Sequence, residues 1–280
     1  MAKSRKLPGL LSWYHHEKQG FDALARTAES ILLNLIKKEQ IPIVSVSSRV
    51  KTSDSLVEKF KRKRYKNPQT EITDFVGLRV IAYTEDDASR VCDLVKRSFN
   101  IDSKQSVDKG EQLEVDQIGY RSYHFICDLG EKRVALPEFE AFHGRLFEIQ
   151  VRTVLQHAWA EVEHDRNYKF SEVLPAALQR RLYLISGMLE VGDRELNQLS
   201  RDIDSYVVGI EKRVRQGRLN NEELTTAVLR ALIPKLTNAI KKAKIYLNAT
   251  TVTLTTVLEE CLAFGVKTTT DLEALFDANF

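Results

Sequence analysis

The hydrophobic pattern changes its period near residue 170, and this change constrains the fold more than any other feature of the chain. Residues 121–129 and 145–151 alternate polar and apolar side chains, which is typical of strands with one buried face. From about residue 175 to residue 216, apolar residues instead recur at steps of three and four, which predicts one long helix. A helix of roughly 40 residues extends about 60 Å and must pack against its own domain or another chain. The pattern therefore predicts an α+β domain followed by helices.

The remaining elements fit this division. Helical spacing covers about residues 21–38, 53–65, 85–99 and 153–169, and further strand-like runs cover 43–46 and 78–83. Residues 100–110 are polar and are expected to form a loop, and three or four short helices are expected over 221–280, interrupted at Pro234, Asn248 and Gly265. We therefore predict a mixed β-sheet flanked by helices over 1–174, a long helix over 175–217, and a small all-α region over 218–280.

The composition is that of an ordinary globular protein. Hydrophobic residues make up 43% and charged residues 29%, and the formal net charge is only +3. The three cysteines, Cys92, Cys127 and Cys261, have no spacing typical of a disulfide framework or a zinc site, which favours a reducing compartment. No apolar run has the length of a membrane span, and the basic N-terminus lacks the apolar segment of a signal peptide. We expect a cytoplasmic protein with no membrane partner.

One charged run stands out. Residues 59–66 hold six cations in eight positions. Such a run usually forms a solvated helix face, but it also suits the phosphates of a nucleic acid.

Glu148 is the most informative single residue. It lies in the middle of an alternating strand and shares its face with Gln150 and Arg152. A carboxylate there is unfavourable for packing unless that face is solvated or functional. Tyr120 and His124 share one face of the preceding strand, so the sequence predicts a polar site on neighbouring strands.

Acids and bases also surround the earlier strands. Asp74 directly precedes a strand that carries Arg79, where it is either a turn residue or a hard oxygen ligand for Mg²⁺. Cations at the end of another strand and on the following helix have a spacing that suits a polyphosphate: Arg49, Lys51 and Lys59, with Ser55 between them. The chain has no G-x-x-x-x-G-K-[ST] loop and no H-E-x-x-H motif, which excludes a P-loop enzyme and the common zinc hydrolases.

Over about residues 40–170 these segments resemble the synthetase domain of the RelA/SpoT family. The matching segments are Arg49-x-Lys51 with Ser55 and Lys59, Asp74-x-x-Gly77-x-Arg79, Gly119-Tyr120-Arg121-Ser122-x-His124 and Glu148-x-Gln150-x-Arg152-Thr153, followed by a helix with Gln156-His157-Ala158-Trp159-Ala160-Glu161. The resemblance implies a nucleotidyltransferase-like fold. It also implies transfer of the β,γ-pyrophosphate of ATP to the 3′-hydroxyl of GDP or GTP, which makes (p)ppGpp. Only about 40 residues precede this region, without the family's His-Asp pair, so we expect a stand-alone synthetase that does not degrade its product.

The resemblance assigns a role to each residue. It implies Mg²⁺ on Asp74 and Glu148, with Glu148 orienting or deprotonating the 3′-hydroxyl. The residues that would bind ATP are Arg49, Lys51, Ser55, Lys59 and Arg79. Those that would bind the acceptor are Tyr120, Arg121, His124, Gln150 and Arg152, with Tyr120 stacking on the base.

The acceptor loop leaves two other functions open. Asp116, Gln117 and Ile118 stand where small synthetases of the family usually carry a lysine and an asparagine, and Tyr123 replaces a common smaller aliphatic. Toxin members of the family place the pyrophosphate on the 3′-end of tRNA, and the cations of residues 59–66 would suit that acceptor. A catalytically silent binding module is the third reading. The helix over 175–217 would join a second copy of the chain, or an antitoxin or regulatory partner.

Overall fold

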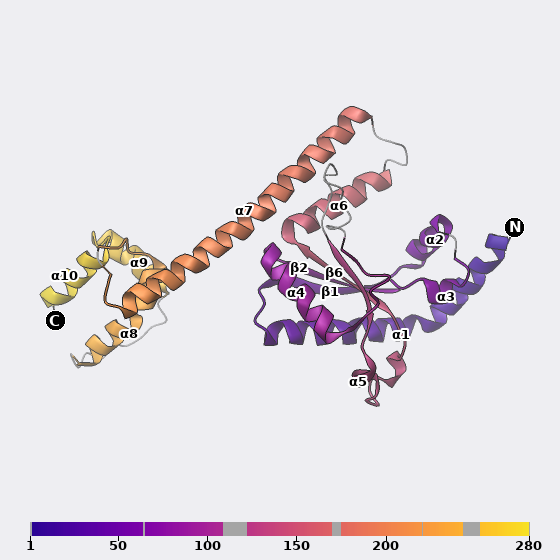
Figure 1. Cartoon of the computed structure of the whole chain (residues 1–280), viewed down its shortest axis with the longest axis horizontal. Helices are drawn as coiled ribbons and strands as arrows, with labels where there is room; N and C mark the ends of the chain where they lie inside the picture. Colours follow the sequence, from indigo (N-terminus) through magenta and orange to yellow (C-terminus); the bar gives the residue numbers. More distant parts are fainter. Residues whose placement is uncertain are drawn as a thin grey trace. The chain divides into compact units, whose positions relative to one another are not determined.

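The computed structural model describes residues 2–63, 65–108, 122–169, 175–219, 221–242 and 253–279 (Figure 1). Two compact units make up the chain, Met1–Asn197 and Gln198–Phe280. The boundary between them lies inside helix α7 (Ala176–Arg215), whereas the sequence placed it at the ends of that helix. The three-part division of the chain into 1–174, 175–217 and 218–280 therefore stays a prediction.

A mixed six-stranded sheet forms the centre of the first unit, as the sequence predicted. Its strands are β1 (Ile43–Val50), β2 (Val76–Ala82), β3 (Asn100–Ile101), β4 (Val107–Asp108), β5 (Tyr123–Asp128) and β6 (Phe147–Thr153). They follow the order β1-β2-β6-β5-β3, with β4 also paired to β5. β2 and β6 run parallel, and the other pairs are antiparallel. This order places β2 beside β6. Asp74 lies just before β2, and Glu148 is the second residue of β6.

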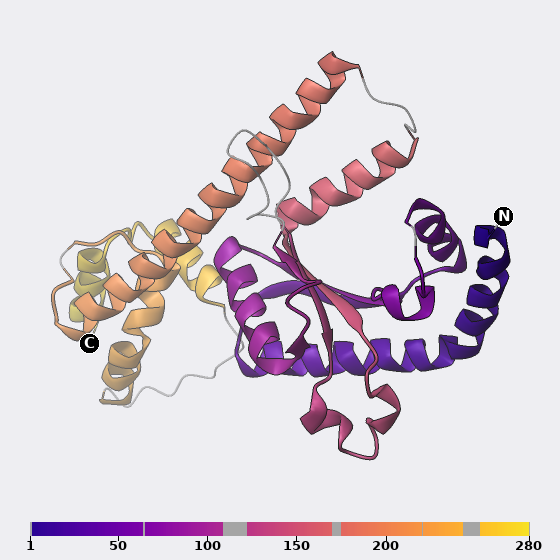
Figure 2. The same cartoon turned by 45° about the vertical axis from the view of Figure 1, so that its right-hand side comes forward.

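Helices cover one face of the sheet and leave part of the other open. The helices of this unit are α1 (Ala2–Lys38), α2 (Ser53–Arg62), α3 (Pro68–Glu71), α4 (Glu85–Ser98), α5 (Glu131–Val134), α6 (Val154–Lys169) and the first half of α7, with a short 3-10 turn at Glu140–Phe142. α1 packs against β1 and β2, α4 packs against β2 and β6, and Figure 2 shows α1 as one long helix running along the sheet. Their buried stripes, which include Leu24, Ala28, Val91 and Val95, meet the apolar face of the strands. The helices predicted from the apolar spacing over 21–38 and 85–99 are confirmed.

The structure also differs from the sequence prediction in individual elements. α1 begins at Ala2 rather than near residue 21, because Leu10 and Tyr14 are buried against the first core. The expected loop over 100–110 contains β3 and β4, whose two residues each are too short to show an alternating pattern. Pro234 lies inside α8 (Thr226–Lys242) instead of ending a helix, and it is exposed, so its ring meets solvent while Val228 and Leu229 hold the helix to the second core.

The second unit is a small helical domain. The end of α7 packs with α8, α9 (Leu254–Ala263) and α10 (Thr269–Asn279) around a core made of Ile210, Val214, Leu224, Val228, Leu229, Val266 and Leu272. Gly265, with φ +80°, follows α9 and ends it, as the sequence predicted.

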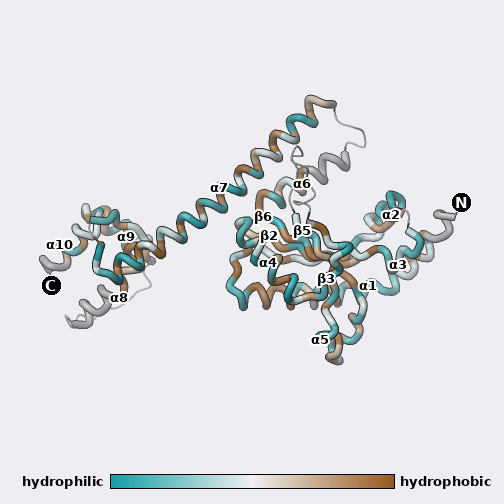
Figure 3. The backbone as a smooth tube through the Cα atoms, viewed as in Figure 1, coloured by the Kyte–Doolittle hydropathy of each residue, from teal (hydrophilic) through white to brown (hydrophobic). Residues whose placement is uncertain are grey.

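α7 confirms the long helix, but its two halves differ in what they bury. Apolar and polar residues alternate along the helix (Figure 3). Ile210 and Val214 are buried, whereas Ile185, Leu199 and Ile203 from the same apolar series are 47–54% exposed. In the first unit the buried residues of α7 are polar: Ser186, Asp193 and Asn197. Gly192 lies where a Cβ would come within 3.1 Å of Leu155 Cδ1, so the absent side chain allows α7 to approach α6.

Candidate active site

Strand register brings the predicted site residues to one face of the sheet. Arg49 on β1 pairs with Gly77 on β2, and Gly77 pairs in turn with Glu148 on β6. Arg79 pairs with Gln150, and Gln150 pairs with His124 on β5. Paired residues of neighbouring strands point to the same side, so these residues form two adjacent rows on one face of the sheet: Arg49, Gly77 and Glu148 in the first, and Arg79, Gln150 and His124 in the second. The opposite side carries the buried apolar residues of the core, such as Leu78, Phe125 and Ile149.

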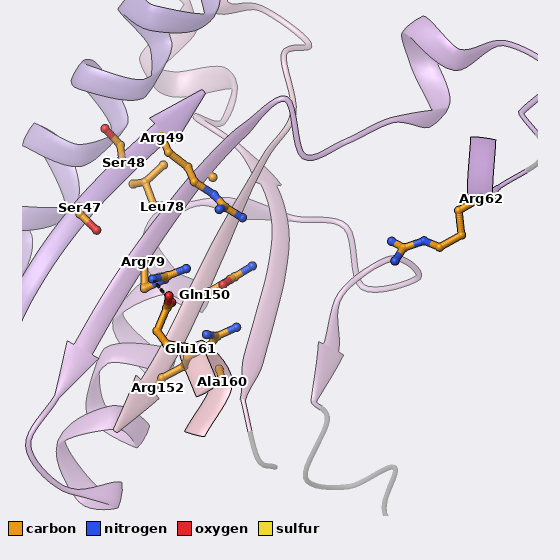
Figure 4. A pocket seen from close by; sticks show the side chains of 11 residues that line it. Ser47, Ser48, Arg49, Arg62, Leu78, Arg79, Gln150, Arg152, Ala160 and Glu161 are labelled. Atoms are coloured by element: carbon orange, nitrogen blue, oxygen red, sulfur yellow. Dashed lines mark hydrogen bonds and ion pairs between the residues drawn. The ribbon is translucent and has the colours of Figure 1, made fainter. Parts of the chain in front are cut away.

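A pocket of about 580 Å³ opens on this polar face (Figure 4). Its lining comes from β1, β2, β6, α2 and α6 and comprises Ser47, Ser48, Arg49, Arg62, Gly77, Leu78, Arg79, Gln150, Arg152, Ala160 and Glu161. Four of these residues are arginines, and only one is an acid. The volume suits a small molecule, and the excess of guanidinium groups favours an anionic one.

Asp74 does not line this pocket and lies in an ion-pair cluster with two lysines. Its Oδ2 lies 3.0 Å from Lys51 Nζ, and its Oδ1 lies 2.6 Å from Lys59 Nζ. Burial alone would raise the pKa of Asp74, but the charges and hydrogen bonds of Lys51 and Lys59 together outweigh it and lower this pKa. Asp74 is therefore ionised at neutral pH.

An aromatic cluster on the inner side supports the segment that carries Lys51. The Tyr14 hydroxyl donates a hydrogen bond to the Lys51 carbonyl, and the Lys51 N–H donates to the Phe75 carbonyl at 2.8 Å. Tyr14 also stacks on Phe75, with ring centroids 6.0 Å apart. Because Phe75 directly follows Asp74, this cluster fixes the backbone of both charged residues. α1 thus supports the site from the far side of the sheet.

Glu148 is held on both of its carboxylate oxygens. Oε1 lies 2.7 Å from His124 Nδ1, and Oε2 accepts a hydrogen bond of 2.8 Å from Gln150 Nε2. His124 Nε2 in turn lies 2.8 Å from Ser122 Oγ. Burial raises the pKa of Glu148, but the hydrogen bonds from His124 and Gln150 contribute to outweighing it, so this pKa lies below its ordinary value despite the negative charge of Asp74. The strand thus presents an oriented, ionised carboxylate.

α6 closes one side of the pocket through an ion pair. Arg79 Nη1 donates to Glu161 Oε1 at 2.8 Å, as the dashed line in Figure 4 shows. His157 Nδ1 lies 3.7 Å from the same Glu161 oxygen. Burial, and then the charge of Arg79, lower the pKa of His157, against the opposing effect of Glu161. His157 is therefore neutral at neutral pH, and the ion pair of Glu161 is with Arg79.

The remaining predicted residues are placed differently. Ser55 is exposed in the first turn of α2, where its N–H donates to Thr52 Oγ1 at 3.2 Å, and it does not line the pocket. Arg152 lines the pocket and is only 9% exposed. Tyr120 and Arg121 lie outside the described residues, as do Asp116, Gln117 and Ile118.

Seven residues that line the pocket were not predicted as site residues from the sequence, and four of them have polar side chains. Ser47 lies two positions before Arg49 on the same strand, so strand alternation was the signal for it. Ser48 lines the pocket and donates a hydrogen bond of 2.5 Å to Glu29 of α1. Arg62 was counted only as part of a cation run, and Glu161 only as part of a matching helix. Neither has a local signal, because only tertiary structure brings these helices over the sheet.

Asp74 and Glu148 could contribute ligands to a metal ion, but they do not form a complete metal site by themselves. Across the described ranges, no group of three or more His, Cys, Asp and Glu residues has an arrangement that could hold a metal ion. Asp74 and Glu148 are two carboxylates, and the negative charge of Asp74 acts to raise the pKa of Glu148. Mg²⁺ typically takes one or two carboxylates together with substrate phosphates and water, so this pair suits it.

None of the helices in the described part of the chain combines the length and apolarity needed to cross a membrane.

Known proteins share this region of the chain. The family described as "Region found in RelA / SpoT proteins" matches residues 48–173. The GTP pyrophosphokinase YjbM of Bacillus subtilis (strain 168) is 31% identical over 172 residues, which cover 58% of this chain and 74% of that protein. The GTP pyrophosphokinase YwaC of the same organism is 27% identical over 177 residues, covering 62% and 76% respectively.

Solved structures agree with these relatives. The crystal structure of small alarmone synthetase 1 from Bacillus subtilis superposes with a TM-score of 0.58 at 25% identity, over 69% of this chain and 98% of that chain. The same synthetase bound to its product pppGpp gives a TM-score of 0.54 at 27% identity with the same coverage. About three tenths of this chain therefore has no counterpart in those structures.

Proposed function

The chain belongs to the RelA/SpoT family and is a GTP pyrophosphokinase, and from this premise we propose how its residues carry out the reaction. ATP is the pyrophosphate donor, GDP or GTP is the acceptor, and the product is (p)ppGpp. The structures of a relative with AMPCPP and with pppGpp support these substrates. The observation that carries the proposal is the pair of adjacent rows that contain Arg49 and His124, which sets an anion-binding pocket beside an ionised carboxylate held on both oxygens.

ATP binds in the half of the site formed by β1, β2 and α2. Arg49 and Arg79 line the pocket from adjacent strands, and their planar guanidinium groups suit the two faces of an adenine ring. Lys51 and Lys59 leave their ion pairs with Asp74 and bind the phosphates of ATP instead, whose charge they neutralise. Ser55, in the first turn of α2, adds a donor at a helix N-terminus.

Mg²⁺ fits the carboxylate of Asp74, with Glu148 as its second protein ligand. Once phosphates take over Lys51 and Lys59, both oxygens of Asp74 are available to a hard cation. When bound, the ion supplies positive charge that neutralises the charge developing on the phosphates during transfer.

Glu148 acts as the general base on the acceptor. The 3′-oxygen of the acceptor ribose attacks the β-phosphorus of ATP, and its proton passes to Glu148. The bond from the β-phosphorus to the bridging oxygen of AMP breaks, and AMP leaves with that oxygen. His124 and Gln150 keep the carboxylate in place during this step. The acceptor lies on the side of β5 and β6, with Arg152, Tyr120 and Arg121 as its further contacts.

An isotope experiment tests this reaction. The purified protein is incubated with γ-³²P-labelled ATP and Mg²⁺, together with GDP, GTP, an adenine nucleotide or deacylated tRNA. We expect label in the guanine nucleotides, and the Glu148→Gln variant should lose at least about 10³-fold of this activity. Glu138→Gln, an exposed glutamate away from the pocket, is the matched control and should retain it. Wild-type turnover by Glu148→Gln would remove Glu148 from the mechanism.

Other expectations remain predictions. The named relatives act on GTP, so tRNA is not favoured as the acceptor, and labelled tRNA in the same experiment would reverse this choice. A second copy of the chain, or an antitoxin or regulatory partner, on the helix over 175–217 also stays a prediction, as does the cytoplasmic location.

A further inference from the structure

Ser122 is fully buried and does not line the pocket. It is 0% exposed and immediately precedes β5. His124 follows two positions later, so both side chains lie on the same side of the chain. Ser122 Oγ is 2.8 Å from His124 Nε2, and the other ring nitrogen, Nδ1, is 2.7 Å from Glu148 Oε1. Three side chains thus form one hydrogen-bonded line that ends at the proposed base.

The directions of these hydrogen bonds follow from the groups at the ends of the line. An ionised carboxylate only accepts, so Nδ1 of His124 must carry the proton that lies against Glu148. In neutral imidazole the other nitrogen then has a free lone pair, and a serine hydroxyl can donate to it. In the opposite tautomer, the lone pair of Nδ1 would face the negatively charged oxygen of Glu148. The N–H on Nε2 would then point at the hydroxyl hydrogen of Ser122, unless that hydroxyl turned away.

We propose that Ser122 is a positioning residue of the reaction, which holds His124 in the Nδ1–H tautomer and in one ring orientation. This inference rests on the proposed function, because its effect reaches the substrate only through Glu148. With Ser122 in place, His124 permanently occupies Oε1 of Glu148 and Gln150 occupies Oε2. Because both oxygens are held, rotation of the carboxylate is restricted, and its remaining lone pairs are left for the acceptor hydroxyl.

Removing the hydroxyl should act on the chemical step. Partners that orient a functional histidine typically contribute about 10- to 100-fold to activity. We therefore expect Ser122→Ala to lower kcat by about this factor and to leave the KM for ATP within about threefold. Ser122→Thr, which retains a hydroxyl, should recover part of the loss. Ser103→Ala, in the exposed turn between β3 and β4, is the matched control and should behave as the wild type.

A double-mutant cycle separates this role from a structural one. The side-chain amide introduced by His124→Asn can replace Nδ1 as the donor to Glu148, but nothing replaces Nε2. If Ser122 acts through His124, adding Ser122→Ala to His124→Asn should change kcat by less than about twofold. If both losses multiply, Ser122 acts independently of His124, and the inference is wrong.

The tautomer itself can be measured without any loss of activity. In protein labelled with ¹⁵N-histidine, the ¹⁵N shifts of His124, assigned by their absence in His124→Asn, distinguish a protonated Nδ1 from a protonated Nε2. We expect Nδ1–H in the wild type and a mixture in Ser122→Ala. An Nε2–H tautomer in the wild type would overturn the inference even where Ser122→Ala fails to fold. Failure of the proposed function would look different, because Glu148→Gln would then remain active whatever the tautomer of His124.

Discussion

The hydroxyl of Thr153 donates a hydrogen bond of 2.7 Å to the carboxylate of Asp193, and this bond joins the end of β6 to α7. Thr153 Oγ1 also accepts from the Gln156 N–H at 3.1 Å, and Gln156 Oε1 accepts from the Thr153 N–H at 3.0 Å. Four residues along α7, Asn197 accepts from the Asp86 N–H at 3.0 Å, which satisfies a free donor at the start of α4. The strand that carries Glu148 is thereby connected to the long helix through buried polar contacts.

Replacing Asp193 by asparagine should stabilise the protein at neutral and higher pH. Burial raises the pKa of Asp193 to about 6, with a further contribution from Glu85 and against the hydrogen bond from Thr153. The folded state therefore holds a proton that the unfolded state has released, so the free energy of unfolding falls as pH rises from about 4 to about 6 and is level above that. We expect Asp193→Asn to gain about 1 kcal/mol at pH 8, after allowance for screening, and almost nothing at pH 4.

Urea unfolding of both proteins at several pH values would measure this difference. The exposed Asp204→Asn, on the same helix, is the matched control and should show no such trend. An equal gain at both ends of the pH range would mean that the charge of Asp193 is not its cause.

Asp74→Asn should weaken the dependence on Mg²⁺ rather than the fold. The amide keeps the shape of the side chain but removes the charge that Lys51, Lys59 and the metal share. We expect most of the activity to be lost at millimolar Mg²⁺ and part of it to return at higher concentrations. Titrating Mg²⁺ into Asp74→Asn and into the exposed control Asp93→Asn checks this, and an unchanged midpoint in Asp74→Asn would exclude Asp74 as a ligand.

The two partners of the Arg79–Glu161 ion pair should differ in their importance. If Arg79 stacks on the donor base, Arg79→Ala should raise the KM for ATP by about 10-fold or more. Glu161 is 57% exposed, so its ion pair contributes at most about 1 kcal/mol, and Glu161→Gln should raise this KM by less than about fivefold. Steady-state kinetics with ATP varied at saturating GDP would give both values. The reverse order would place the base elsewhere.

Tyr14→Phe should affect ATP more than the acceptor, although Tyr14 lies on the far side of the sheet. The variant leaves the partly buried carbonyl of Lys51 without this donor, which should lower the free energy of unfolding by about 1–3 kcal/mol. It should also loosen the Lys51 backbone and raise the KM for ATP severalfold. Tyr83→Phe, at a tyrosine that is 54% exposed, is the control. A KM effect confined to GDP would contradict the division of the site into two halves.

Charge reversal beside the pocket separates nucleotide from tRNA acceptors. Arg62 lines the pocket and must be left intact, whereas Lys61 and Lys63 are exposed and do not line it. Lys61→Glu together with Lys63→Glu should leave GDP labelling within about twofold. Labelling of tRNA that falls steeply with salt and disappears in this variant would instead support the toxin function.

Most of the fold followed from the periods of the hydrophobic pattern. The alternation around Glu148 predicted that Gln150 and Arg152 share its face, and the pairing of His124 with Gln150 supplies the neighbour. The pattern could not reveal that His124 and Gln150 bond to the two oxygens of Glu148, because bond partners depend on the register between strands. It also could not show that α6 brings Glu161 to Arg79, 82 positions away in the chain.

The polar attachment of α7 has a consequence for how firmly the helix is held. Ser186, Asp193 and Asn197 face the first unit, while Leu196 and Leu199 of the same helix are 46–54% exposed. Detaching this half of α7 would expose little apolar surface to water, so the hydrophobic effect would contribute little to holding it in place. Water could also replace each lost hydrogen bond at a small net cost. The contact therefore fixes where this half of α7 lies on the domain, but it adds little to the energy that keeps the domain folded.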